Sequence, residues 1–259
     1  MRNNLDLQSL RTLVRKNGRA IIKNIVDNHI NRNHVAKNKL KICMFCSSMS
    51  DITREHVLPR WVFKKDTKRF FITDVNGQRQ TYNTTTIAAC SNCNTNILNS
   101  LEKYIKNLFN GRDLNKISFS NEEIQNIIRW LEIIDYKFHV LDVVRTFKSS
   151  SHAGYVPYLA DFPISVLREK VNFSPTKVIA ELRRSQIRIG VKRKDNHVNS
   201  LVTFKTSNKG FYFFHHLNEF IFIELPRQQI AILYFYSQIF NDELTARDAS
   251  LETLKKFYN

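Results

Sequence analysis

The sequence predicts an α+β fold, with helices in its first two thirds and an antiparallel sheet toward its end. Three observations support this prediction. Apolar residues recur at helical spacing in several segments, and all four cysteines fall in two C-x-x-C pairs. Short apolar or alternating runs, separated by turn residues, then follow one another from residue 187 to residue 237. With 42% hydrophobic residues, the 259-residue chain is apolar enough to fold around a core.

The chain is strongly basic. It contains 40 Lys and Arg against 23 Asp and Glu, which gives a formal net charge of +17 and a pI near 9.8. An excess of this size favours a polyanionic partner, DNA or RNA. The longest wholly apolar run covers residues 230–236, far short of the roughly 20 residues that cross a bilayer, and no export signal is recognisable. We therefore expect a cytoplasmic protein without a membrane partner.

Residues 1–40 form a basic N-terminal segment. Residues 7–28 are predicted to be an amphipathic helix with Leu10, Val14, Ile21 and Ile25 along one side. Basic residues recur on the neighbouring side of this helix. They are Arg11, Arg15, Arg19 and Lys23. This basic ridge is either a solvated face or a surface that binds nucleic-acid phosphates.

The four cysteines predict one zinc site. Cys43 and Cys46 form the first pair, Cys90 and Cys93 form the second, and no cysteine is left over. Each C-x-x-C turn can bring two thiolates to about 2.3 Å from one metal, and four such ligands close a tetrahedral, structural Zn²⁺ site. The alternative is a pair of disulfides in a secreted protein, which the missing export signal disfavours.

Residues 41–111 are predicted to form a module around this zinc. A short strand is expected at residues 53–57. A hairpin is expected over residues 69–87, with a type I′ turn at Asn76-Gly77. Helical spacing of apolar residues predicts a helix over residues 94–110.

Residues 112–259 are predicted to form a C-terminal α+β domain that recognises substrate, forms a homodimer or binds a protein partner. Ser120 and Glu123 make a capping box that begins a long helix reaching about residue 147. Two shorter helices are expected over residues 163–171 and 174–184. The predicted strands cover residues 187–193, 198–205, 211–214, 219–225 and 230–237.

Two further groups in this domain allow more than one interpretation. A basic cluster could contact phosphates or could be the edge of a hairpin that discourages strand pairing. Its members are Arg183, Arg184, Arg188, Lys192, Arg193 and Lys194. His215-His216 could suggest a second metal site, but no third ligand accompanies the pair, so residues at the end of a strand are the simpler interpretation.

Two motifs accompany the cysteine pairs. Glu55-His56-Val57-x-Pro59 follows the first pair, and Asn94 directly follows Cys93. In this order the motifs resemble the HNH endonucleases, the ββα-metal nucleases, over roughly residues 40–110. The resemblance implies a treble-clef-like ββα core.

Residue by residue, the resemblance assigns His56 as general base, with Glu55 and Asn94 as oxygen ligands of a catalytic Mg²⁺ or Mn²⁺. A base and a hard cation are what phosphodiester hydrolysis needs. The chain departs from the family pattern at Leu98, where many relatives have a metal-binding His. Asn76 and Asn83 are both candidates for the family's middle Asn.

The leading hypothesis is therefore a metal-dependent HNH endonuclease acting on DNA. A bacterial or phage defence system is one setting in which such an enzyme would be the effector. The alternative is a non-catalytic, zinc-dependent module that binds DNA or RNA. His56 distinguishes the two hypotheses, because a binding module needs no general base.

Overall fold

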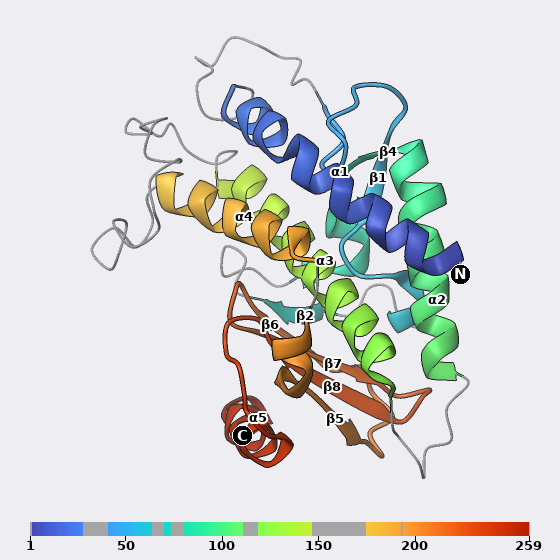
Figure 1. Cartoon of the computed structure of the whole chain (residues 1–259), viewed down its shortest axis with the longest axis vertical. Helices are drawn as coiled ribbons and strands as arrows, with labels where there is room; N and C mark the ends of the chain where they lie inside the picture. Colours follow the sequence, from blue (N-terminus) through green and yellow to red (C-terminus); the bar gives the residue numbers. More distant parts are fainter. Residues whose placement is uncertain are drawn as a thin grey trace.

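The computed structural model describes residues 2–27, 41–63, 70–73, 80–110, 119–146, 175–192 and 194–258. Within them, helices combine with a two-stranded and a six-stranded sheet (Figure 1). All strand pairs but one are antiparallel, so the predicted α+β class is confirmed. None of the described helices is both long enough and apolar enough to cross a membrane.

The predicted N-terminal helix is present as α1 (Arg2–Ile25). Its apolar side is buried, and the helix packs closely against α4 (Pro175–Gly190). At the crossing, a Cβ added to Gly18 would lie 2.9 Å from Oε1 of Gln186. The absence of a side chain at Gly18 therefore allows the two helices to approach.

The region of the two cysteine pairs contains strands β1 (Ile52–His56) and β4 (Thr86–Cys90), which pair antiparallel with each other. A π-helical turn (Asn92–Leu98) then leads into α2 (Asn99–Asn110). The predicted strand at 53–57 and the predicted helix at 94–110 are both confirmed. Together these elements give the local order strand, strand, helix.

The predicted hairpin over residues 69–87 is only partly correct. Strands β2 (Phe70–Thr73) and β3 (Gln80–Thr81) do pair antiparallel, and the expected turn at Asn76-Gly77 lies outside the described residues. The second half is not one strand, because a 3-10 turn (Tyr82–Thr84) interrupts it. The hydroxyl of Thr84 bonds to the carbonyl oxygen and hydroxyl of Thr81, which draws the backbone out of the ladder before β4 begins.

The large sheet has the strand order β3-β2-β6-β7-β8-β5. Its remaining strands are β5 (Leu201–Lys205), β6 (Phe213–His216), β7 (Phe220–Leu225) and β8 (Ile230–Phe235). Four of the five strands predicted after residue 187 are therefore confirmed. The single parallel pair joins β2 to β6, so a strand from between the two cysteine pairs belongs to the same sheet as the C-terminal strands.

Helix α3 (Asn121–Thr146) lies between the sheet and the α1–α4 pair (Figure 1). The predicted capping box is present: Ser120 N–H donates to Glu123 Oε2 over 2.8 Å, and Glu123 N–H donates to Ser120 Oγ over 3.3 Å. Between residues 126 and 141, every side chain except that of Arg129 is buried. Because the helix is enclosed on all sides, its polar residues must find partners inside the protein.

The strand predicted over residues 187–193 is wrong. Helix α4 continues to Gly190, and a 3-10 turn (Asp195–Ser200) follows. The helix continues because Leu182, Gln186 and Ile189 turn inward at helical spacing. The helix predicted over residues 163–171 lies outside the described residues.

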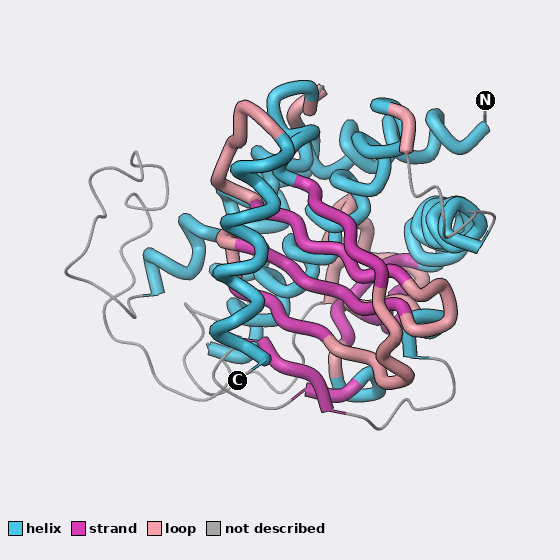
Figure 2. The backbone as a smooth tube through the Cα atoms, turned by 90° about the horizontal axis from the view of Figure 1, so that it is seen from below, coloured by secondary structure: helices cyan, strands magenta, loops and turns pink. Residues whose placement is uncertain are grey.

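A C-terminal helix, α5 (Glu243–Tyr258), was not predicted. Asp242 caps it, because its Oδ1 accepts a hydrogen bond of 2.8 Å from Thr245 N–H. Ala249 and Leu254 pack on the face of the sheet that carries Phe222 and Leu233, whereas α3 contacts the opposite face. The sheet therefore has helices on both sides (Figure 2).

Candidate metal centre and active site

The four cysteine thiols converge at one point. Their sulfur atoms all lie within 4.8 Å of one another, and Sγ of Cys46 lies 3.6 Å from Sγ of Cys90. In a tetrahedral site with Zn–S bonds of about 2.3 Å, neighbouring sulfurs would be about 3.8 Å apart. The thiol cluster therefore fits a zinc ion. It is the one group of three or more metal-ligating side chains found among the described residues.

Backbone hydrogen bonds hold the first cysteine pair in place. The Cys43 N–H donates to Ser48 O over 2.8 Å, and Met44 N–H donates to Ala88 O over 3.0 Å, which joins the turn to β4. From α3, the Tyr136 hydroxyl donates to Met44 O. A hydrogen bond with the Cys93 thiol lowers the pKa of Cys43 to about 5, and the same bond raises the pKa of Cys93, while burial raises the pKa of Cys46 to about 11. The neighbouring thiols thus stabilise one thiolate, that of Cys43, and thiolate is the form that binds metal.

Asn94 connects the second cysteine pair to β1. Its Nδ2 donates to Thr53 Oγ1 over 2.9 Å and approaches Arg54 O at 3.4 Å. The two other predicted site residues, Glu55 and His56, follow on the same strand. Glu55 is buried and His56 is half-buried, on opposite sides of the strand as its pleat requires.

The Glu55 carboxylate lies against a buried lysine from α3. Lys137, only 2% exposed, forms an ion pair with Oε1 of Glu55 and donates to His56 O over 3.1 Å. Its Nζ also lies 3.7 Å from Oε1 of Glu102 on α2. Burial raises the pKa of Glu102 to about 7, and the neighbouring Glu55 charge adds to this effect while Lys137 opposes it. The ammonium group of Lys137 thus lies close to two carboxylates, those of Glu55 and Glu102.

The imidazole of His56 has a different environment. It stacks on the ring of Tyr82, the first residue of the 3-10 turn that precedes β4. The pKa of His56 lies below its usual 6.5, chiefly because of burial, with Lys137 and Arg60 contributing and Glu55 opposing. At neutral pH the ring is therefore uncharged and able to accept a proton.

Glu55 and Asn94 each have a side-chain oxygen that is not used in the hydrogen bonds described above. Lys137 engages Oε1 of Glu55, while Oε2 has no hydrogen-bond partner among the described residues. Asn94 uses its nitrogen toward β1, so its Oδ1 takes no part in that contact. Such oxygens suit Mg²⁺, which keeps several waters. Leu98 is buried in the core, Asn83 is exposed, and Asn76 lies outside the described residues.

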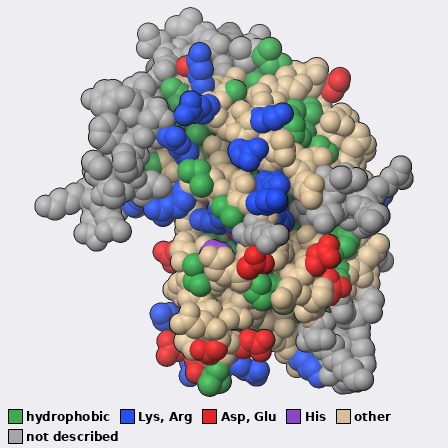
Figure 3. Space-filling model, viewed as in Figure 1, with side chains coloured by type: hydrophobic (Ala, Val, Ile, Leu, Met, Phe, Trp, Pro, Cys, Tyr) green, Lys and Arg blue, Asp and Glu red, His purple; other side chains and the backbone are tan. Residues whose placement is uncertain are grey.

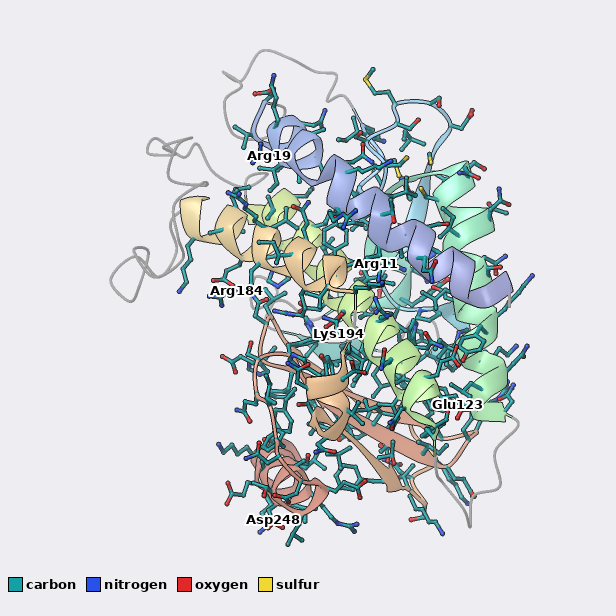
Figure 4. All side chains as sticks on the ribbon, viewed as in Figure 1. Arg11, Arg19, Glu123, Arg184, Lys194 and Asp248 are labelled. Carbon is teal, nitrogen blue, oxygen red and sulfur yellow. The ribbon has the colours of Figure 1, made fainter. Side chains whose placement is uncertain are left out.

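The structure brings α1 and α4 to one face of the protein, where Lys and Arg side chains gather (Figure 3). Arg15, Arg19 and Lys23 are exposed there, as is Lys192. Arg184 pairs with Glu181 at 3.4 Å while 41% of its side chain stays exposed, and Arg183 is partly exposed. Arg193 lies outside the described residues. We call Arg15, Arg19 and Lys23, together with Arg184 and Lys192, the basic face. Figure 4 labels Arg19 and Arg184 on this face.

Other members of the predicted basic groups serve the fold instead. Arg11 donates to Lys192 O over 3.2 Å. Arg129 on α3, which belongs to neither predicted group, donates to Val191 O over the same distance, so both guanidinium groups stabilise the end of α4. Arg188 forms a 2.7 Å ion pair with the buried Asp135, and Lys194 forms a 2.8 Å ion pair with the buried Glu132. The hairpin-edge interpretation of this cluster is wrong, because Arg183, Arg184 and Arg188 lie on helix α4 and no hairpin forms there.

His215 belongs to the same buried network. Its Nε2 lies 3.0 Å from Oδ1 of Asp135, and its ring stacks on Phe138. His139 Nε2 lies 3.4 Å from the other oxygen of Asp135. His215 is therefore a core residue on β6, in keeping with the interpretation of His215-His216 as strand residues.

Sequence reasoning missed Lys137 and Tyr82 as neighbours of His56 and assigned no role to Glu102. A signal for Lys137 exists: it lies within the apolar stripe of α3, between Ile134 and Leu141, where a lysine needs a buried partner. No match was found when the chain was compared with protein-family models, curated proteins and solved structures. The likeness to HNH endonucleases therefore rests on the motif residues given above.

Proposed function

We propose that the protein is an HNH-type endonuclease that hydrolyses phosphodiester bonds of DNA, with His56 as general base. One observation carries this proposal. A half-buried histidine with a lowered pKa ends β1, within a strand–strand–helix unit that also holds the thiol cluster, Glu55 and Asn94. A neutral imidazole next to oxygen ligands is the arrangement that activation of water near a phosphate requires.

In the proposed reaction, the uncharged imidazole of His56 takes a proton from a water molecule, which then attacks phosphorus. The products would be a 3′-hydroxyl and a 5′-phosphate. Glu55 and Asn94 would hold Mg²⁺ or Mn²⁺, which when bound would stabilise negative charge on the phosphate and the leaving oxygen. Tyr82 orients the imidazole through the ring stack, and Lys137 fixes the strand end through His56 O.

Zinc has a structural part in this proposal. Four thiolates would fill its coordination sphere, so substrate would find no open position there. Because Asn94 directly follows Cys93, a zinc ion in the cluster would hold Asn94 against Thr53 on β1. The DNA backbone would contact the basic face, whose row of cations recognises phosphates rather than bases.

The decisive experiment compares cleavage of plasmid and single-stranded DNA by wild type and His56→Ala in Mg²⁺ or Mn²⁺. His216→Ala is the matched control, since it removes a half-buried histidine from β6. We expect His56→Ala to keep its zinc and DNA affinity while its cleavage rate falls by roughly 10² to 10⁴. Cleavage by His56→Ala at the wild-type rate would refute the assignment.

A second function is favoured by one observation. Lys137 already neutralises Glu55, as expected in a purely structural cluster. The alternative is accordingly a zinc-dependent module that binds DNA or RNA without cutting it. Tight binding by wild type, with no cleavage in any divalent ion, would support this alternative over the nuclease.

A further inference from the structure

Lys137 has an unusual position for a charged side chain. It projects from α3, yet its ammonium reaches Glu55 on β1 and Glu102 on α2, and only 2% of the side chain is exposed. Three elements from distant parts of the sequence therefore meet at one cation. A lysine is rarely buried to this extent unless its charge is compensated.

The charges at this point do not balance when both carboxylates are ionised. Glu55 and Glu102 then carry two negative charges against the one positive charge of Lys137. Glu102 is only partly enclosed, since 23% of its side chain is exposed, whereas Glu55 is buried. The remaining negative charge attracts a cation, but any cation bound to Glu55 would also lie close to the Lys137 ammonium and be repelled by it.

We propose that Lys137 is a positioning residue that competes with the divalent ion for Glu55. It keeps the Glu55 carboxylate in place when no ion is bound, and it sets how tightly an ion binds there. The inference rests on the proposed function in one respect, the role of Glu55 as an oxygen ligand. It names a further residue for that site, supplied by the part of the chain outside the HNH-like motifs.

A purely structural lysine would behave differently. If Lys137 only filled a buried ion pair, its removal would destabilise the protein without raising its affinity for a divalent ion. If it competes with the ion, its removal leaves two carboxylates without their ammonium, so the ion binds more tightly and stabilises the folded protein more. Affinity for the ion therefore distinguishes the two roles.

The test measures Mn²⁺ binding to the zinc-loaded full chain without nucleic acid, from the electron paramagnetic resonance signal of free Mn²⁺. Lys137→Met should bind Mn²⁺ at least about tenfold more tightly than wild type, because a unit positive charge a few ångströms away has been removed. Lys106→Met is the matched control, since it deletes an exposed lysine from α2 and should leave the affinity unchanged. Unchanged or weaker binding by Lys137→Met would overturn the proposal.

Glu102→Gln provides a second measurement if Lys137→Met does not fold. Without the Glu102 carboxylate, the Lys137 ammonium interacts with Glu55 alone and one negative charge is missing. Mn²⁺ should therefore bind several-fold more weakly than in wild type. Affinity equal to or above that of wild type would contradict the proposal. Glu55→Gln should abolish this binding, and a Glu55→Gln affinity equal to wild type would also overturn it.

Failure of this inference can be told apart from failure of the proposed function, because no DNA is present. If Lys137→Met binds Mn²⁺ more tightly while His56→Ala still cuts DNA at the wild-type rate, the competition stands and the nuclease assignment falls. If His56→Ala loses cleavage but Lys137→Met binds Mn²⁺ no more tightly, the nuclease assignment stands and Lys137 is structural.

Discussion

The imidazole of His56 lies flat on the ring of Tyr82, with ring centroids 3.9 Å apart and planes within 4° of parallel. Tyr82 is also packed against Phe63, so its ring is held from a second side. Stacking fixes the plane of the imidazole and hence the direction of its nitrogen lone pair. Proton transfer depends strongly on that direction.

We expect Tyr82→Ala to lower the cleavage rate by roughly tenfold or more, because the imidazole loses its orientation. Tyr82→Phe keeps the stacked ring and should cleave within a few-fold of wild type. Single-turnover rates on plasmid DNA measure both effects. Equal rates for Tyr82→Ala and Tyr82→Phe would show that the stack does not orient His56.

Removal of one thiol should release the zinc. We expect one zinc per wild-type chain by elemental analysis and a loss of zinc and of cooperative unfolding in Cys93→Ser, because metal binding is coupled to folding at such sites. Ser91→Ala changes an exposed neighbour and should retain the metal. Wild-type protein purified with reduced thiols but without zinc would disprove the metal assignment.

Reversing charge on the basic face should weaken DNA binding. For Arg15→Glu combined with Arg19→Glu, we expect lower affinity on unrelated DNA sequences and a shallower dependence of affinity on salt, because fewer counterions are released. Lys255→Glu with Lys256→Glu makes the same charge change on α5 and serves as control. If both double variants bound alike at every salt concentration, the basic face would be only a solvated surface.

Asp135→Asn should destabilise the fold without touching the candidate active site. Asp135 is fully buried and faces Arg188, His139 and His215. Its replacement leaves a buried guanidinium unpaired, which costs roughly 3–5 kcal/mol of unfolding free energy. Urea denaturation measures this cost, and a loss below about 1 kcal/mol would show that the network contributes little.

The same pair of proteins tests a pH dependence. Burial alone would raise the pKa of Asp135, but His139 and Arg188 outweigh burial and hold it well below 3.8. A depressed pKa stabilises the fold above the unfolded-state value near 3.9, and this contribution is lost as the pH falls further. The stability difference between wild type and Asp135→Asn should therefore be larger at pH 5 than at pH 3 and shrink below about pH 4.

The features that could be predicted from the sequence are those that depend on local periodicity. The apolar side of α1, the capping box of Ser120 and Glu123, and the strands β7 and β8 all follow from spacing that neighbouring residues define. Residues 187–191 alternate like a strand, yet helix α4 continues to Gly190, where Arg188 pairs with Asp135 in the core. Whether these residues form a helix or a strand depends on this tertiary contact, which a short stretch of sequence does not reveal.

The candidate site shows the same division. The cysteine pairs and the Glu55-His56 motif are contiguous patterns, so they could be recognised in the sequence. The role of Lys137 depends on a partner 82 residues away, and Tyr82 reaches His56 only because β4 returns beside β1. Pairings over such separations are set by the whole fold.

The parallel pairing of β2 with β6 has a practical consequence for dissecting the protein. Ile72 pairs with Phe214 and Thr73 with His215, so backbone groups more than a hundred residues apart complete one ladder. A fragment ending near residue 111 would leave β2 without this neighbour, and one beginning there would leave β6 exposed along one side. Unpaired strand edges invite association with other chains, so we expect either fragment to aggregate where the intact protein does not.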